Sequence, residues 1–204
     1  MDDPSIVSRE TIEKLLRYAE HLARWQKTTN LIGAGTVDDI WGRHVLDSLQ
    51  LLNHLPAQPL RIADLGSGAG LPGLILAIGA PGPGWEVSLI ESNSKKVGFL
   101  RWVAADLGVQ VRIVPERIEQ VIELNADVVV SRALADLPSL LGYAAPLVSN
   151  GGWCCFHKGQ DVDEELTRAT KYWRFEHQKR VSRVAGGGCV LTIRNLSPRP
   201  VGAA

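Results

Sequence analysis

A glycine-rich turn between a strand-like and a helix-like segment constrains the fold of this chain more than any other feature. Residues 60–65 have the short, largely apolar pattern of a buried strand, and glycines follow at positions 66, 68 and 70. Residues 71–79 then have the pattern of a helix. Glycines allow the backbone to approach a ligand closely, and the start of a helix presents free amide donors. Together the three segments predict a nucleotide-type pocket at the carboxyl end of a parallel strand.

Strand-like and helix-like segments alternate along the rest of the chain. Apolar or β-branched runs predict strands at 60–65, 85–90, 109–114, 126–130 and 153–156. Helices are predicted between and after them, at 71–79, 94–107, 117–124, 137–148 and from 161 onwards. Two closing strands, near 178–184 and 189–194, are predicted to be antiparallel to each other across the glycine run 186–188. This order predicts an α/β, Rossmann-like fold with a mostly parallel seven-stranded sheet and helices on both faces.

The first sixty residues predict a helical extension to this core. Apolar residues recur there at a spacing of three to four in two stripes, which are Ile12, Leu15, Leu16, Ala19, Leu22 and Ala23, and Trp41, Val45, Leu49 and Leu52. A turn-rich connection at 28–35 separates them. We therefore expect a single domain over residues 1–204. It would comprise an N-terminal helical extension at 1–58, the Rossmann-like core at 59–196 and a frayed tail at 197–204.

Composition restricts the compartment and the partners of the protein. The 22 Lys and Arg residues balance 22 Asp and Glu, so nucleic-acid binding would depend on local basic patches. No run approaches the ~18 apolar residues of a membrane span, and the amino terminus lacks the pattern of a signal peptide. The three cysteines, Cys154, Cys155 and Cys189, lack metal-ligand spacing and are expected to be buried in a reducing compartment. The sequence thus predicts a cytoplasmic protein that uses neither a membrane nor a metal.

The residues around the turn distinguish two classes of cofactor. The dinucleotide-binding pattern needs a third glycine at position 71, where this chain has Leu71. Asp64 opens the turn, and Glu91 ends the next strand, where a carboxylate can accept hydrogen bonds from ribose hydroxyls in either class. No tyrosine is followed by a lysine four residues later, so the centre of a short-chain dehydrogenase is missing. These features favour S-adenosylmethionine as the cofactor and a Rossmann-like class I methyltransferase as the protein.

The segment after the fourth predicted strand bears on which atom is methylated. It reads Ser131-Arg132-Ala133, not the Asn/Asp-Pro-Pro-aromatic sequence of amino-methylases, and no Pro-Cys pair of a carbon-5 pyrimidine methylase occurs. A purine ring nitrogen needs only orientation, because the methyl donor is itself activated. N7 of a guanine carries no proton to remove, so no obligatory general base is predicted for it. The alternatives are a small-molecule or protein methyltransferase, and a non-catalytic ribosome- or nucleotide-binding module that retains the pocket.

Six segments occur in an order and spacing that match one family. They are Asn30-Leu31, the Arg43-His44-Val45-Leu46-Asp47-Ser48 element, the turn 64–73 that ends in Leu71-Pro72-Gly73, 95–101, 131–133 and Lys158-Gly159. Over about residues 22–160 the chain resembles the RsmG (GidB) family, bacterial 16S rRNA guanine-N7 methyltransferases that act in the 530 loop of the small subunit. The resemblance implies 16S rRNA, or the 30S ribosomal subunit, as the substrate. We expect the protein to act as a monomer.

The resemblance also implies roles for single residues. It places the cofactor against Gly66, Leu71 and Arg132, and its adenine beside Ile118 and Glu119. The turn and the strand end add three further residues from their positions alone, so the expected cofactor-binding set is Asp64, Gly66, Gly68, Leu71, Glu91, Ile118, Glu119 and Arg132.

Polar residues outside the turn each have a functional and a structural interpretation. His44, Asp47 and Ser48 share one side of a helix, where they either position the target base or fasten the N-terminal helices to the sheet. The substrate-positioning candidates are Arg132, His44 and Lys158, and the RNA-binding candidates are Lys95, Lys96, Arg101 and Lys158. A solvated face is the alternative for the lysines. Residues 168–183 hold six Lys or Arg among three aromatics, which suits single-stranded RNA or an amphipathic helix.

Overall fold

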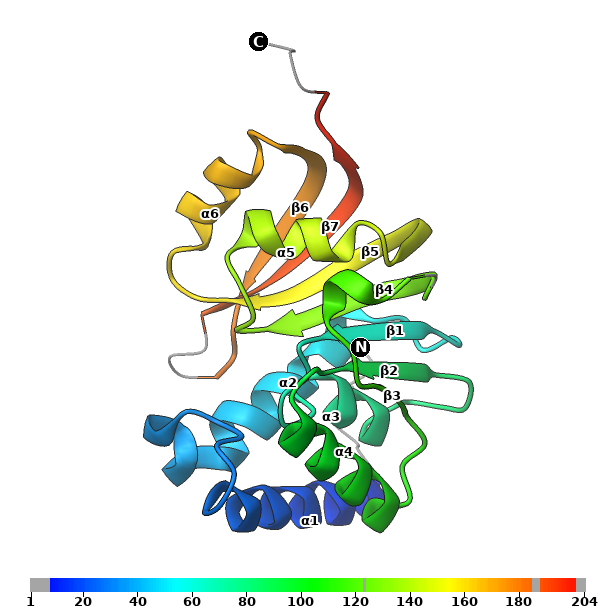
Figure 1. Cartoon of the computed structure of the whole chain (residues 1–204), viewed down its shortest axis with the longest axis vertical. Coiled ribbons are helices and arrows are strands. Elements are labelled where there is room, and N and C mark those ends of the chain that lie inside the picture. Colours follow the sequence, from blue (N-terminus) through cyan, green and yellow to red (C-terminus); the bar gives the residue numbers. More distant parts are fainter. Residues whose placement is uncertain (1–7, 123, 185–187, 201–204) are drawn as a thin grey trace.

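The alternating segments form one seven-stranded sheet in the computed structural model, which describes residues 8–122, 124–184 and 188–200 (Figure 1). The strand order is β3-β2-β1-β4-β5-β7-β6. The strands are β1 Arg61–Leu65, β2 Glu86–Ile90, β3 Arg112–Val114, β4 Ala126–Arg132, β5 Val148–Lys158, β6 Trp173–Val181 and β7 Cys189–Pro198. The first five are parallel, and β7 is antiparallel to both β5 and β6. The predicted Rossmann-like fold is therefore confirmed.

Helices cover both faces of the sheet, as expected (Figure 1). One layer contains α1 Arg9–Gln26, α2 Asp47–Leu49, α3 Gly73–Ile78 and α4 Ser94–Leu107. The other contains α5 Leu137–Ala144 and α6 Val162–Ala169. Each layer encloses its own apolar core. Because successive strand residues point to opposite faces, Cys154 lies in one core and Cys155 in the other, and both are buried free thiols like Cys189.

The sheet order creates the crevice that holds the site. Strand β1 lies between β2 and β4, so the chain reverses its direction across the sheet there, and ligands of open α/β sheets bind at such points. Leu65 at the end of β1 pairs with Ile90 on one side and Ser131 on the other. The residues that follow these three are Gly66, Glu91 and Arg132, and they therefore lie side by side at one edge of the sheet.

The first helix buries most of the predicted apolar stripe, including Leu15 and Leu22, but not all of it. Ile12 and Leu16 are 44% and 48% exposed, whereas Tyr18 is fully buried and His21 nearly so. Helix α1 packs on α4 through aromatic rings. The rings of His21 and Trp102 meet edge to face, with their centroids 4.6 Å apart. The buried face is therefore centred on Leu15, Tyr18 and Leu22, and Ile12 and Leu16 lie at its exposed margin.

The second apolar stripe forms an irregular helical unit rather than one α-helix. It begins with the 3-10 turn η1 Ala34–Asp39 and continues through the π-helical turn η2 Trp41–Leu46, α2, and the 3-10 turn η3 Gln50–His54. Val45 of this unit is completely buried. We refer to residues 41–54 as the helical arm, because it extends along the carboxyl ends of the sheet and lines the site described below.

Local signals fixed some element boundaries and failed at others. Helix α4 has the predicted bounds, since the Asn93 side chain caps its first amides and Gly108 ends it in a left-handed conformation. The helix predicted at 117–124 was wrong: only the single turn η4 Ile118–Gln120 forms, because Val121 is extended and packs its side chain into the core. The first closing strand begins at Trp173, earlier than predicted.

The end of the core also lies further along than predicted. Strand β7 continues through Ser197 and Pro198, which pair with Arg174 and Trp173 of β6. The boundary predicted at residue 196 was therefore two residues short, because a cross-strand ladder holds a segment that has little apolar pattern. Residues 201–204 of the predicted tail and the glycines 186–187 lie outside the described residues.

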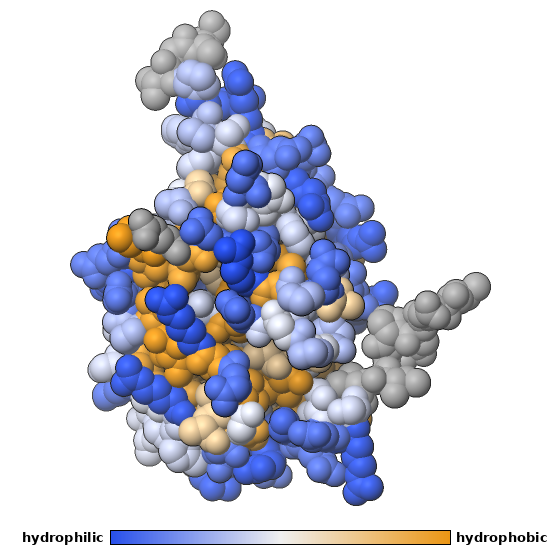
Figure 2. Space-filling view, turned by 90° about the vertical axis from the view of Figure 1, so that its right-hand side faces the viewer, coloured by the Kyte–Doolittle hydropathy of each residue, from blue (hydrophilic) through white to orange (hydrophobic). Residues whose placement is uncertain are grey.

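The side of the molecule at the amino ends of the parallel strands carries a broad apolar area within hydrophilic surroundings (Figure 2). A hollow there is lined by the first residues of β1, β2 and β4 and by the segment that leads into β3. In the described ranges, no helix has both the length and the apolar composition needed to cross a membrane.

Candidate cofactor and substrate site

The glycine-rich turn leaves room for a ligand beside its backbone. Gly68 and Gly70 adopt φ angles of +59° and +88°, a region that favours glycine. A Cβ added to Gly70 would lie 2.7 Å from Cβ of Leu74, so this glycine is needed for packing. At Gly68, by contrast, an added Cβ would meet only the Gly66 carbonyl oxygen, at 3.8 Å, so the space above it is open. The turn therefore has one packed side and one open side.

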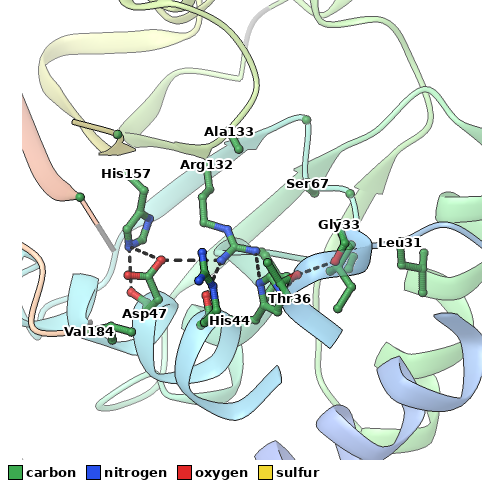
Figure 3. A pocket seen from close by; sticks show the side chains of 18 of the residues that line it. Leu31, Gly33, Thr36, His44, Asp47, Ser67, Arg132, Ala133, His157 and Val184 are labelled. Atoms are coloured by element: carbon green, nitrogen blue, oxygen red, sulfur yellow. Dashed lines mark hydrogen bonds and ion pairs between the residues drawn. The ribbon is translucent and has the colours of Figure 1, made fainter. Parts of the chain in front are cut away.

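A cavity of about 490 Å³ opens on this free side (Figure 3). The turn forms one wall, the helical arm and residues 31–36 form another, and the ends of β4 and β5 close it. The structure brings together seven of the predicted site residues here, namely His44, Gly66, Gly68, Leu71, Lys96, Arg132 and Lys158.

Neither of the two predicted carboxylates, Asp64 and Glu91, is among the residues that line the cavity. Asp64 is fully buried, and its Oδ2 accepts a hydrogen bond from the Gly73 amide at 3.0 Å, which holds the start of α3. Its Oδ1 has no partner among the described residues, and burial raises the pKa of Asp64 to about 7. Glu91 accepts hydrogen bonds from the amides of Gly68, at 2.9 Å, and Asn93, at 2.7 Å. Glu91 thus joins the end of β2 to the turn.

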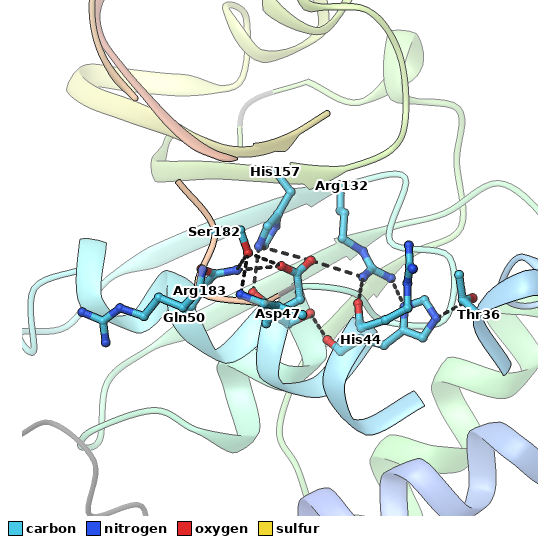
Figure 4. Close-up of polar contacts among 11 residues, drawn as sticks. Thr36, His44, Asp47, Gln50, Arg132, His157, Ser182 and Arg183 are labelled. Carbon is cyan, nitrogen blue, oxygen red and sulfur yellow. Dashed lines mark hydrogen bonds and ion pairs between the residues drawn. The ribbon is translucent and has the colours of Figure 1, made fainter. Parts of the chain in front are cut away.

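Arg132 connects the end of β4 to the helical arm (Figures 3 and 4). Its guanidinium donates to the Arg43 carbonyl at 2.9 Å and to Nδ1 of His44 at 2.7 Å. It also lies 3.6 Å from Oδ2 of Asp47 in an ion pair whose side chains are 16% and 8% exposed. A guanidinium can only donate, so Nδ1 of His44 accepts. Nε2 then carries the proton and donates to the Thr36 hydroxyl at 2.8 Å.

His44 should make the stability of the protein depend on pH between about 4 and 6.5. Burial, followed by the charges of Arg132 and Arg43, lowers the pKa of His44 from 6.5 to about 4. Over that window the unfolded chain binds a proton that the folded chain excludes, so stability falls as pH drops and is unaffected by this group above 6.5. We expect His44→Asn, which keeps an acceptor for Arg132, to make this dependence shallower in urea unfolding at a series of pH values. An unchanged slope would assign the dependence to other groups.

Asp47 extends the network to three further elements (Figure 4). Its Oδ1 accepts from Gln50 at 2.6 Å and from the Ser182 hydroxyl at 3.2 Å. His157 of β5 donates from Nε2 to the Asp47 carbonyl at 2.8 Å. These contacts fasten the helical arm to the sheet, in agreement with the structural interpretation of the Asp47 region.

Several members of this network were not predicted from the sequence. Gln50 lies three residues after Asp47, a spacing that places both on one side of a helix, and this was the available signal. His157 directly precedes the Lys158-Gly159 pair. Ser182 gives no local signal, because its hydrogen bond to Gln50 spans 132 residues of sequence.

Lys158 is held in a buried ion pair at the edge of the cavity. Its ammonium lies 2.6 Å from Oε2 of Glu165 in α6 and donates to the Ala135 carbonyl at 2.9 Å. The same Glu165 oxygen accepts from the Leu137 amide at 2.6 Å, at the start of α5. Lys158 therefore ties β5 to both helices of the second layer, and Glu165 was not anticipated from the sequence.

The remaining predicted residues lie around the cavity or apart from it. Lys95 and Arg101 are exposed on α4 and do not line the cavity, although Lys96 does. Ile118 and Glu119 lie in η4, after β3, and likewise do not contribute to its lining. The amphipathic-helix alternative for residues 168–183 is wrong over 173–181, which form strand β6.

The fold and the turn define the class of protein. The structure aligns with a putative S-adenosyl-L-methionine-dependent methyltransferase from Methanococcus maripaludis, with a TM-score of 0.60 and 15% sequence identity. The alignment covers 86% of this chain and 90% of that one. The protein thus has the fold of S-adenosylmethionine-dependent methyltransferases.

The sequence comparisons define the family within that class. The family model GidB, rRNA small subunit methyltransferase G, matches residues 11–192, and the chain belongs to this family. Ribosomal RNA small subunit methyltransferase G of Paramagnetospirillum magneticum is 48% identical over 94% of this chain and 92% of its own length. The protein of the same name from Rhodospirillum centenum is 44% identical, over 95% and 88%. The resemblance inferred from short motifs is confirmed.

Proposed function

We propose that the protein transfers a methyl group from S-adenosylmethionine to N7 of a guanine in the 530 loop of 16S rRNA. Membership of the GidB family supports a methyltransferase that acts on small-subunit rRNA. The observation that carries the proposal is the open side of the glycine turn, which faces a cavity closed by Arg132. The free space above Gly68 and the carboxylate of Glu91 at the end of β2 both fit an adenosyl ligand with an amino-acid tail.

Several of the predicted residues would hold different parts of this cofactor. The backbone of the turn at Gly66 and Gly68 would lie against the cofactor. Glu91 already accepts from the amides of Gly68 and Asn93, and the remaining lone pairs of its carboxylate would accept hydrogen bonds from the ribose hydroxyls. Ile118 and Glu119, beyond the end of β3, would border the adenine. S-adenosylmethionine supplies a methyl group that is already activated by its sulfonium sulfur.

The side chains around the cavity favour orientation over proton transfer. Both ring nitrogens of His44 are engaged, and Asp64 is buried behind the turn. A guanine N7 carries no proton, so the reaction needs no base. We therefore propose that Arg132 and His44 hold the cavity wall against which the target base is placed, and that substrate alignment supplies the rate acceleration.

Methyl transfer from tritiated S-adenosylmethionine tests the proposed function. We expect label on 30S subunits or 16S rRNA, recovered as N7-methylguanine in mass analysis, and no label on a panel of metabolites and proteins. Analysis of rRNA from a deletion strain should show loss of the same nucleotide. Label on a metabolite or a protein alone would favour those substrates, whereas cofactor binding without any transfer would favour a non-catalytic module. Parallel reactions on naked rRNA and on 30S subunits identify the substrate form.

We further propose that the protein acts as a cytoplasmic monomer. Lys95 and Arg101, which are exposed, and Lys96, which lines the cavity, would contact the rRNA.

Glu91→Gln should weaken cofactor binding about ten- to a hundredfold. Hydrogen bonds to a charged acceptor contribute about 1.5–3 kcal/mol, and the amide of glutamine has one acceptor oxygen where the carboxylate has two. Isothermal titration calorimetry with S-adenosylmethionine measures the change, with Glu86→Gln at the exposed opposite end of β2 as the control. Equal affinity of the two variants would remove Glu91 from the cofactor site.

A further inference from the structure

A second cavity lies on the helical-arm side of the sheet, where β5, β7 and β6 continue beyond the helices. It has a volume of about 670 Å³. Its walls are the end of the helical arm with the chain that follows it, and three neighbouring strands. The residues that line it are Asn53, His54, Leu55, Pro56, Gln58, Trp153, Glu176, His177, Gln178, Arg180, Thr192 and Arg194. We call this cavity the lateral groove. The proposed methyltransferase chemistry does not use it.

The lateral groove has two guanidiniums and one carboxylate in its lining, so it carries a net positive charge. Among the described residues, neither Arg180 nor Arg194 forms an ion pair, and the Arg194 guanidinium lies over the ring of Trp153, 4.7 Å from its centroid. The acidic residue of the lining, Glu176, accepts a hydrogen bond from Asn195. Burial and the charges of Arg180 and Arg183 lower the pKa of His54, so these charges act inside the groove.

Two other cations of the same basic stretch are neutralised locally. Lys179 lies 2.6 Å from Asp163, and Arg168 lies 3.7 Å from Asp136. Because successive strand residues point to opposite faces, Lys179 faces α6 while Arg180 faces the groove. Lys179 and Arg168, which we call the paired set, are thus held by carboxylates and do not line the groove. Arg180 lines it together with Arg194 of β7, and we call these two the free set. Only the structure reveals this division.

The groove and the cofactor cavity share two elements. Arg43, His44 and Asp47 of the helical arm line the cavity, and Asn53 and His54 at its end line the groove. From residue 47 to residue 54 a helical backbone rises about 10–14 Å. On the other wall, Ser182 follows the last residue of β6, and its hydroxyl donates a hydrogen bond to Asp47. An extended polyanion lying in the groove would therefore lead to the entrance of the cavity.

We propose that the lateral groove binds the sugar-phosphate backbone of the RNA that flanks the methylated nucleotide. This rests on the proposed function, since it assumes an rRNA substrate. Two unpaired guanidiniums suit phosphates, and the side chains of Asn53, Gln178 and Thr192 can hydrogen bond to ribose hydroxyls and phosphate oxygens. Contacts of this kind position a strand without reading its sequence.

Paired charge-removing variants test the proposal. The groove variant is Arg180→Gln/Arg194→Gln, and the control is Arg168→Gln/Lys179→Gln, which removes the same charge from the paired set. Affinity for 30S subunits or a 16S rRNA fragment is measured by filter binding over a range of salt concentrations. For the groove variant we expect about tenfold weaker binding and a salt slope shallower by about 1.4, since each phosphate contact contributes about 0.7 on single strands. The control should stay within about twofold of wild type.

Further measurements separate loss of the groove from loss of the fold. The groove variant should bind S-adenosylmethionine and unfold thermally as wild type does, and Arg180→Lys, which keeps the charge, should retain RNA affinity. Equal losses in the groove and control variants would overturn the proposal, as would an unchanged salt slope. Binding is measured separately from methyl transfer. A wild-type protein that binds RNA through the groove but methylates no rRNA would therefore contradict the proposed function alone.

Discussion

Replacing Arg132 by glutamine is expected to slow methyl transfer about a hundredfold and to lower the free energy of unfolding by about 3–5 kcal/mol. The loss of stability follows from Asp47, whose side chain is 8% exposed and would lose its guanidinium partner. The loss of activity follows from the helical arm, because Arg132 holds the Arg43 carbonyl and the ring of His44 in the cavity wall. Arg132→Lys should recover little, since an ammonium cannot reproduce the planar fork.

A charge-balanced variant separates the two losses. Arg132→Gln/Asp47→Asn removes both charges, so we expect it to regain part of the stability but not the rate of methyl transfer. Urea unfolding and single-turnover transfer to 30S subunits measure the two quantities. Arg61→Gln is the control, because its ion pair with Asp127 lies on the surface and should contribute no more than about 1 kcal/mol. If Arg132→Gln were as stable as Arg61→Gln, the ion pair between Arg132 and Asp47 would contribute little to the free energy of unfolding.

Glu165→Gln is expected to destabilise the protein by about 3–5 kcal/mol, although Glu165 lies outside the family motifs. The variant leaves the Lys158 ammonium charged and buried, with side chains 7% and 14% exposed in the wild-type pair. Lys158→Met should cost a similar amount, because it leaves the Glu165 carboxylate uncompensated. Lys158→Met/Glu165→Gln removes both charges while the glutamine can still accept from the Leu137 amide. We therefore expect the double variant to be more stable than either single one in urea unfolding.

RNA binding by the same variants tests the functional interpretation of Lys158. An ammonium held by Glu165 and the Ala135 carbonyl is engaged within the protein, so loss of Lys158 should change RNA affinity less than loss of Arg180 and Arg194. The comparison uses filter binding at one salt concentration, at a temperature where every variant is folded. If Lys158→Met weakened RNA binding more than the groove variant, Lys158 would instead be a direct RNA contact.

Short-range patterns predicted most of the fold, because the alternation of strand and helix segments can be read from neighbouring residues alone. The parallel core follows from apolar runs such as Val128–Val130, which are buried from both faces. Where the outcome depended on a distant partner, the prediction failed. The burial of His21 in α1 depends on Trp102 of α4, and the length of β7 depends on pairing with β6. The sequences of α1 and β7 alone do not show these contacts.

The site was predictable where strand ends determine it and unpredictable where long-range pairs do. Glu91 was selected because parallel strands bring their carboxyl ends to one edge, and the family resemblance added Gly66 and Arg132 at the same edge. The partners that hold this edge, among them His157, Ser182 and Glu165, come from elements that are adjacent only after folding. The free set of cations in the lateral groove belongs to the same category, since pairing to α6 decides which cations remain available.

The contact between Tyr18 and the glycine turn bears on how this protein can be engineered. The Tyr18 hydroxyl donates to the Ala69 carbonyl at 2.7 Å, so the first helix of the chain supports the backbone of the turn from below. A minimal domain cut to the Rossmann-like core would lose that support together with the buried side chains of Leu15 and Leu22. Attachment of a reporter or a surface anchor is better directed beyond β7, whose end lies far from α2 and α3, the helices beside the site (Figure 1).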